Sequence, residues 1–414
     1  MPHNESIGLF LGAGASFELG MPLVSHLTGE FKGYFTTDHV RELNAGWRSQ
    51  GGGYDNSVLE TTIGLLARDD LHYENILGYL QTVSTRRQQA FADQYDGMYK
   101  RMVELIYLLL YHRQVGSLPY IIGGFPPFEG LAGLVRQSSP VWAFSLNHDL
   151  VFQLLAAHCN IPLRDGFWPD KTLEIFGNQP RMPKSSLRAD ILTEDDLNRG
   201  NLHLFKTGEG GINLLRLHGA LDMFTFRDGF DLCRLRPEAP EPHTYLTALQ
   251  HVNESIGYWD RGRKARVINE LPYTDETGLE QYLRRTLLAG AQKFDRRFSQ
   301  TLPQKMLDVF RSYVQYVQRL YIVGYSFGDA HIDLVLRNWL ELTEDRKIVI
   351  VDPGRKFLPA YFAHLAPQIT MRQQTAGQFF ADFRSTPLTT AQTSEQEARA
   401  LRRTEFEQKA AKKW

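Results

Sequence analysis

The sequence predicts an α/β fold: a doubly wound, mainly parallel sheet with a helical insertion as a second subdomain. Short apolar runs such as residues 7–11 and 320–323 alternate with stretches of helical periodicity, the pattern of parallel strands joined by helices. Each run ends in small or polar residues, at the edge where open α/β sheets bind ligands. Residues 36–136 carry helical periodicity and no convincing strand. We therefore expect this insertion to pack over the ligand-binding end of the sheet, as a lid or as a plain structural module.

Length, charge and cysteine content exclude several classes of protein. The chain has 414 residues, long for one compact core, with 46 Lys and Arg against 47 Asp and Glu. A net charge of −1 supplies no general attraction for nucleic acid or an anionic membrane, so we expect no direct nucleic-acid binding. Cys159 and Cys233 cannot form a four-cysteine zinc site, so we expect no zinc and a reducing, cytoplasmic location. The best apolar run, residues 105–111, is too short to cross a bilayer, and no export signal is apparent.

The chain divides into four predicted parts: the start of the sheet domain (1–35), the helical insertion (36–136), the remainder of the sheet domain (137–388) and a charged helical tail (389–414). An apolar spacing of four predicts the first helix over residues 15–34, with Pro22 as the point where it bends or restarts. The tail is expected to be an exposed or partner-binding helix or, more simply, a frayed terminus.

The second half of the chain continues the alternation of strands and helices. Further strands are predicted at residues 141–145, 214–217, 320–323, 347–351 and about 369–372. Residues 223–226 and 232–235 are expected to form a small hairpin. Residues 163–213 are predicted to be mixed loop, and residues 281–318 to be helical.

The first strand ends in a turn of small residues, Gly12-Ala13-Gly14-Ala15-Ser16. Glycine at this position lets the backbone approach a pyrophosphate, and the amides of the following helix supply donors, as in Rossmann-like dinucleotide-binding sheets. A merely tight strand-to-helix connection explains the same residues.

The next two strand ends carry the candidate catalytic residues. Asn147 and Asp149 follow the strand at 141–145, and His218 follows the strand at 214–217. A carboxylate can stabilise an oxocarbenium-like state, and an amide can orient a water molecule. An imidazole, with an ordinary pKa of about 6.5, can accept a proton near neutrality. For Asn147 and Asp149 the alternative is a helix cap, and for His218 it is a hydrogen-bonded structural histidine.

The last strand ends carry candidate ligand-binding residues. Gly324 and Ser326 follow the strand at 320–323, and Asp352 follows the strand at 347–351. A carboxylate at the latter position is suited to accept hydrogen bonds from ribose hydroxyls. Asp352 also begins an Asp-Pro-Gly turn, which explains it almost as well. Asp329 is expected to cap the next helix.

Four of these strand ends form motifs, at residues 12–16, 145–149, 217–219 and 324–329. Taken together and in this order, the four motifs resemble those of the sirtuin superfamily. They resemble the sirtuin-like proteins of bacterial antiphage defence more than the protein deacylases. The resemblance runs from residue 7 to about residue 354. It implies an NAD hydrolase that releases nicotinamide and ADP-ribose and depletes NAD as a defence effector. The implied roles are pyrophosphate binding by Gly12, Ala13, Gly14 and Ser16, ribose and phosphate contact by Gly324 and Ser326, and catalysis around the nicotinamide ribose by Asn147, Asp149 and His218.

The sequence departs from the deacylases at one feature. They carry a small domain with four zinc-binding cysteines, which this chain lacks, so their acyl-lysine cleft is in doubt. A deacylase is therefore the least favoured hypothesis, behind a non-catalytic NAD or ADP-ribose-binding sensor or scaffold. The resemblance is greatest to subunits encoded beside a HerA-like hexameric ATPase. It implies a homo-oligomer, such as a large ring, whose activity is controlled by assembly or by that partner.

Overall fold

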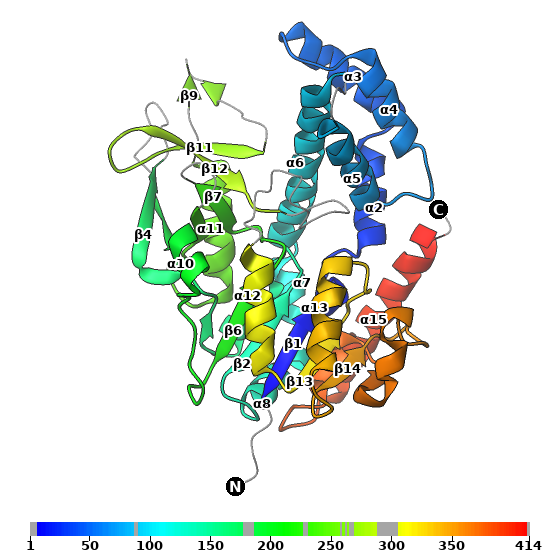
Figure 1. The fold of residues 1–414 in the computed structure, drawn as a ribbon, viewed down its shortest axis with the longest axis vertical. Helices are drawn as coiled ribbons and strands as arrows, with labels where there is room; N and C mark the ends of the chain where they lie inside the picture. The colour runs from blue at the N-terminus through cyan, green and yellow to red at the C-terminus, as the bar shows by residue number, and fades with distance from the viewer. Residues whose placement is uncertain are drawn as a thin grey trace.

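The structure is a computed structural model that describes residues 6–86, 90–176, 186–226, 231–256, 259–260, 263–264, 269–287 and 305–411. Within these residues, a seven-stranded sheet has the order β15-β14-β13-β1-β2-β6-β3, and every neighbouring pair is parallel (Figure 1). This confirms the predicted α/β class with its doubly wound sheet. The strands are β1 (Ile7–Leu11), β2 (Val141–Ser145), β3 (Leu163–Arg164), β6 (Ile212–Arg216), β13 (Arg319–Val323), β14 (Lys347–Val351) and β15 (Ile369–Arg372).

Strand β1 lies at the point where the chain changes direction across the sheet. From β1 the chain proceeds to β2 and β6 on one side, and it later returns to β13 on the other side. All five residues of β1 are buried, which explains its continuous apolar sequence. In open α/β sheets, the crevice at such a switch point is the usual ligand site.

Helices cover the end of the sheet at which β1 and β2 terminate, in the order α1 to α6 (Figure 1). Their bounds are α1 (Gly14–Phe17), α2 (Val24–Tyr34), α3 (Thr37–Ser49), α4 (Asn56–Leu66), α5 (Tyr73–Ser84) and α6 (Ala92–Gly116), followed by α7 (Leu118–Gly123), η1 (Pro126–Gly130) and α8 (Leu131–Val135). The predicted first helix is thus two helices, because Gly20 adopts φ +100° and Pro22 follows it. The ring of His26 on α2 stacks on Phe17 of α1, with centroids 5.3 Å apart.

A second group of strands, of which the sequence predicted only one hairpin, lies beside the sheet (Figure 1). In the described residues, a closed barrel has the order β11-β12-β7-β8-β5-β4. Its strands are β4 (Trp168–Phe176), β5 (Ser186–Leu192), β7 (Met223–Phe226), β8 (Asp231–Leu235), β11 (Glu270–Thr274) and β12 (Glu280–Arg285), and a separate short pair is β9 (Trp259–Asp260) and β10 (Arg263–Lys264).

The barrel corrects two predictions. Residues 163–213 are not mixed loop, because they include β4 and β5, and residues 281–285 are strand rather than helix. Both errors arise from charged side chains at buried positions. Asp190 of β5 and Arg285 of β12 are buried, so the usual alternation of apolar and polar residues is hidden. The predicted hairpin is confirmed as antiparallel β7 and β8, whose connecting residues 227–230 lie outside the described part, as do residues 288–304.

The remaining helices are α9 (Val151–His158), α10 (Glu194–Arg199), α11 (Pro242–Glu254), α12 (Lys305–Tyr313), η3 (Val314–Tyr316), α13 (Ala330–Glu341), η4 (Ala360–Gln368), α14 (Ala376–Ala381) and α15 (Thr390–Ala411). The described part of the tail is docked rather than frayed. Arg399 of α15 is buried, donates to the carbonyl of Tyr120 at 2.9 Å and lies 3.9 Å from the centroid of that ring. None of the described helices is long and apolar enough to cross a membrane.

Close backbone packing joins the C-terminal part of the chain to η1. A Cβ atom added at Gly130 would lie 1.7 Å from the carbonyl oxygen of Phe380, whereas one added at Gly64 in α4 would meet no atom within 4 Å. We expect Gly130→Ala to lower the free energy of unfolding by about 3 kcal/mol through overpacking. The control Gly64→Ala should raise it by about 0.5–1 kcal/mol, since alanine favours the helix. Chemical denaturation measures both, and equal effects would contradict this packing.

Candidate functional site

A cavity of about 500 Å³ opens at the carboxyl ends of the central strands, beneath α2 and α5. Seven of the residues predicted for the site line it: Gly12, Ala13, Asn147, Asp149, His218, Gly324 and Ser326. They come from the turns after β1, β2, β6 and β13, four strands far apart in the sequence. The parallel arrangement gathers these turns at one edge of the sheet.

Two glycine turns form the floor of this cavity by direct contact. The amide of Gly12 donates to the carbonyl of Val323 at 3.0 Å, and the amide of Gly14 donates to that of Gly324 at 2.9 Å. A Cβ atom at Gly12 would lie 2.5 Å from the carbonyl oxygen of Gly324, which itself has φ +64°. The glycines are therefore required by the contact between the turns. Ala13, between them, is left to face the cavity.

Asn147 joins the turn after β2, in which it lies, to the turn after β1. Its side-chain nitrogen donates to the carbonyl of Gly12 and to the hydroxyl of Ser16, each at 3.0 Å. Its backbone amide donates to the hydroxyl of Ser145 at 3.1 Å. The amide plane of Asn147 is thus fixed from the nitrogen side, and its side-chain oxygen accepts no hydrogen bond from the residues that the structure describes.

Asp149 lies at the inner end of the same network. One carboxylate oxygen accepts from the Ser16 hydroxyl at 3.1 Å and from the amide of Val151, at the start of α9, at 3.0 Å. Asp149 therefore accepts from the first amide of α9, whose N-cap residue is Leu150, and it also lines the cavity. Burial raises the pKa of the Asp149 carboxyl to about 6, while the bonds from Val151 and Ser16 act in the opposite direction.

His218 is buried and lies against a carboxylate that the sequence analysis assigned only to helix capping. The Nε2 atom of His218 is 3.2 Å from a carboxylate oxygen of Asp329. The other oxygen of Asp329 accepts from the amides of His331 and Ile332 at the start of α13, as the predicted cap. Asp329 thus has both roles, and its partnership with His218 has no signal in the sequence because 111 residues separate the two.

A tyrosine and a second carboxyl hold Asp329 in place. The hydroxyl of Tyr325 accepts from the amide of Asp329 at 3.2 Å and donates to the carboxylate of Asp333 at 2.9 Å. Burial raises the pKa of the Asp333 carboxyl to about 6, against the lowering effect of the bond from Tyr325. This arrangement fixes the turn after β13 from its inner side.

Helix α2 with the segment before it and the helical insertion together supply the opposite wall. Helix α5 begins at the cavity, where the amide of Tyr73 donates to the hydroxyl of Thr28 on α2 at 3.2 Å, and that of His72 donates to the Asn75 side chain at 3.3 Å. The lining residues from α2, α5, α6 and the segment before α2 are Pro22, Leu23, Val24, Ser25, Leu27, His72, Tyr73, Glu74, Asn75 and Leu110. The insertion is therefore part of the site, whether or not it moves as a lid.

Three predicted site residues do not line this cavity. Gly14 lies in the contact between the turns, and Ser16 is buried behind Asn147. Asp352 accepts from the amide of Gly354 at 2.9 Å, as its turn interpretation requires, and lies 3.5 Å from the guanidinium of Arg355. Gly14 and Ser16 thus contact the lining residues from behind, whereas the side-chain contacts of Asp352 are within its own turn.

The charges around the cavity are unequal. The lining includes the carboxyl groups of Glu74, Asp149 and Asp329, and among the residues that the structure describes it has no lysine or arginine. These carboxyl groups favour a ligand that carries positive charge.

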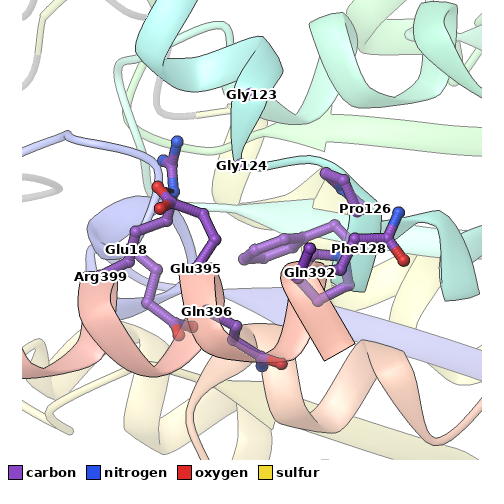
Figure 2. A pocket seen from close by; sticks show the side chains of 11 residues that line it. Glu18, Gly123, Gly124, Pro126, Phe128, Gln392, Glu395, Gln396 and Arg399 are labelled. Atoms are coloured by element: carbon purple, nitrogen blue, oxygen red, sulfur yellow. Dashed lines mark hydrogen bonds and ion pairs between the residues drawn. The ribbon is translucent and has the colours of Figure 1, made fainter. Parts of the chain in front are cut away.

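A second cavity, of about 220 Å³, lies between α15 and the segment from Gly123 to Phe128 (Figure 2). Its walls are mainly apolar, with Glu18 and Arg399 at its edge. Glu18 accepts from the amide of Gly377 on α14 at 2.7 Å, so it joins α1 to the C-terminal helices. None of the candidate catalytic residues lines this cavity.

Among the described residues, no group of three or more His, Cys, Asp or Glu side chains could hold a metal ion. Comparison of the sequence with models of protein families and with curated proteins gives no match.

The raised pKa of Asp149 gives a test of its burial. Below about pH 4 the Asp149 carboxyl is protonated in both the folded and the unfolded chain. Between about pH 4 and 6 it stays protonated only in the folded chain. The stabilisation of the fold by this proton is therefore lost as pH rises through about 6. Relative to Asp149→Asn, the wild type should lose up to about 3 kcal/mol of unfolding free energy from pH 4 to pH 7. Denaturant titrations of both proteins measure this difference, and a difference independent of pH would contradict the buried carboxyl.

Proposed function

We propose that the chain binds NAD in the 500 Å³ cavity and hydrolyses its nicotinamide N-glycosidic bond, giving nicotinamide and ADP-ribose. The observation that carries this proposal is the convergence of Asn147, Asp149 and His218 in one cavity at the switch point of the sheet. A site that bound NAD without hydrolysing it would need the glycine turns but no base. A buried histidine paired with a carboxylate adds a means of moving a proton.

The size and charge of the cavity suit this substrate. Its volume falls within the range of about 300–1,000 Å³ that is typical of small-molecule sites. The carboxylates of Asp149 and Asp329 favour the cationic nicotinamide ring and the positive charge that develops on the ribose. The amides of Gly12 and Gly14 already donate to other carbonyls of the turns. The pyrophosphate is therefore bound, in this proposal, by the amide of Ala13 and by His72 and His148 of the wall.

The proposed reaction forms a bond between a water oxygen and C1′ of the ribose as the bond from C1′ to nicotinamide breaks. The electron pair of the broken bond leaves with nicotinamide, which becomes neutral, and the water proton passes to His218. Asp329, 3.2 Å from Nε2, stabilises the resulting imidazolium. Asp149, with its pKa near 6, is mainly ionised at neutral pH and stabilises the ribosyl cation. The side-chain oxygen of Asn147 accepts a hydrogen bond from the water.

Substitution of the proposed base tests this mechanism. We expect His218→Ala to reduce nicotinamide release from NAD by at least about 100-fold, because general-base catalysis supplies about 10² to 10⁴ in rate. Asn147→Ala should cause a loss of about the same size, because the attacking water is no longer oriented. The matched control is His158→Ala, on α9 and outside the cavity lining, which should change the rate by less than about twofold. Chromatography of products from protein without any acyl peptide measures the rate.

The same assay separates the alternative functions. A protein that binds ADP-ribose without turnover, alone and in its native complex, would be a sensor or scaffold. A requirement for an acetyl-lysine peptide would identify a deacylase. Unchanged activity in His218→Ala would exclude this histidine as the base.

The defence role and the partner rest on the resemblance to sirtuin-like proteins encoded beside a HerA-like ATPase. We expect the chain to form a large homo-oligomer and to co-purify with that ATPase when both are expressed from the native operon. Sedimentation and affinity purification test this. A monomer that recovers no ATPase would contradict it, without bearing on NAD hydrolysis.

A further inference from the structure

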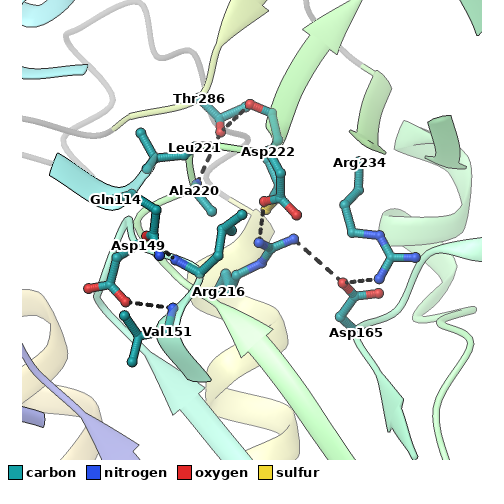
Figure 3. Close-up of polar contacts among 12 residues, drawn as sticks. Gln114, Asp149, Val151, Asp165, Arg216, Ala220, Leu221, Asp222, Arg234 and Thr286 are labelled. Atoms are coloured by element: carbon teal, nitrogen blue, oxygen red, sulfur yellow. Dashed lines mark hydrogen bonds and ion pairs between the residues drawn. The ribbon is translucent and has the colours of Figure 1, made fainter. Parts of the chain in front are cut away.

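A series of alternating charges runs from the loop that carries His218 into the barrel, and Figure 3 shows its first four members. Its members, in spatial order, are Asp222, Arg216, Asp165, Arg234, Asp190 and Arg236. Arg216 is paired with Asp222 and lies 3.5 Å from Asp165, which in turn lies 2.7 Å from Arg234. The side chains of Arg216, Asp222 and Asp165 are at most 4% exposed.

The ion pair between Arg216 and Asp222 closes the loop that carries His218. Arg216 is the last residue of β6 in the parallel sheet, and Asp222 directly precedes β7 of the barrel. The five residues between them, 217–221, include His218. The ion pair therefore joins the two ends of the loop, and it does so at the junction between the sheet and the barrel.

Other contacts hold the loop from independent directions. The amide of Leu217 donates to the carbonyl of Ser145, and the amide of Leu221 donates to that of His148, each at 2.9 Å. The amide of Ala220 donates to the hydroxyl of Thr286 at 3.4 Å (Figure 3).

Gly219, within the loop, approaches the barrel side most closely. It adopts φ +78°, and a Cβ atom there would lie 2.2 Å from the carbonyl oxygen of Thr286. The loop is thus held by β2 on one side and by the end of β12 on the other.

We propose that Arg216 and Asp222 are positioning residues for His218, and that the barrel serves the site by holding this loop. The inference rests on the proposed function, since it concerns the placement of the proposed base. Replacement of a buried ion pair by apolar residues is often neutral or stabilising, so stability alone does not account for the pair. What the pair adds is one defined geometry for the loop, and a displacement of about 1 Å can cost about 100-fold in rate.

The test compares the same substitution, Asp to Asn, at two positions in this series of charges, one beside His218 and one in the barrel. Asp222→Asn should lower kcat for NAD hydrolysis by about 10- to 100-fold with little change in KM, because His218 is displaced while the substrate-binding wall is kept. The matched control is Asp190→Asn, equally buried and paired with Arg234 and Arg236 in the barrel. It should lower the melting temperature and leave kcat within about twofold.

Thr286→Val is a milder second variant, which decides the question if Asp222→Asn does not fold. It keeps the side-chain shape but removes the hydroxyl that accepts from Ala220 and donates to the carbonyl of Met223 at 3.0 Å. We expect a loss of about fivefold in kcat, the equivalent of one hydrogen bond.

A readout independent of catalysis is the rate at which diethyl pyrocarbonate modifies His218, measured by peptide mass spectrometry. His218 is 3% exposed and should react slowly in the wild type and in Asp190→Asn, and at least about threefold faster in Asp222→Asn and Thr286→Val. His243, 62% exposed, serves as the internal reference.

The two readouts separate the possible failures. Equal effects of Asp190→Asn and Asp222→Asn on kcat and on His218 modification would overturn the positioning role. If the wild type releases no nicotinamide but the modification rates follow the expected pattern, the positioning of His218 holds and the proposed function fails.

Discussion

The contact between the turns after β1 and β13 is the constraint on which the site depends. Glycine at positions 12, 14 and 324 lets two backbones approach to distances that no side chain allows. This contact fixes the switch point of the sheet, where the chain crosses from one side of β1 to the other. The two turns also form the floor of the cavity, so their contact fixes the position of that floor.

A short network of hydrogen bonds connects this floor to the polar side chains of the cavity. Asn147 bonds to the first turn and to Ser16, and Ser16 bonds to Asp149. His218 and Asp329 meet on the far side, although their strands are not neighbours in the sheet. The helix that follows β13 is capped by the same Asp329, so the cap that begins α13 also orients the proposed base.

The insertion and the barrel have complementary roles around the sheet. Helix α5 closes the cavity opposite the glycine turns, while the barrel holds the loop after β6. Both additions are made of ordinary helix and strand, and neither supplies a group proposed to react. The chemistry proposed for the site is thus confined to the strand ends, with the added layers as wall and support.

The sequence by itself determined the α/β class, the parallel strands and the strand ends that carry Asn147, Asp149 and His218, because short buried runs and their turns are local patterns. It did not determine the barrel, since the buried charges of Asp190 and Arg285 are paired with residues distant in the sequence. Nor did it determine that Asp329 faces His218, or that Gly14, Ser16 and Asp352 lie outside the cavity lining. Only the tertiary structure decided these points, because they depend on distances between turns that the chain brings together over hundreds of residues.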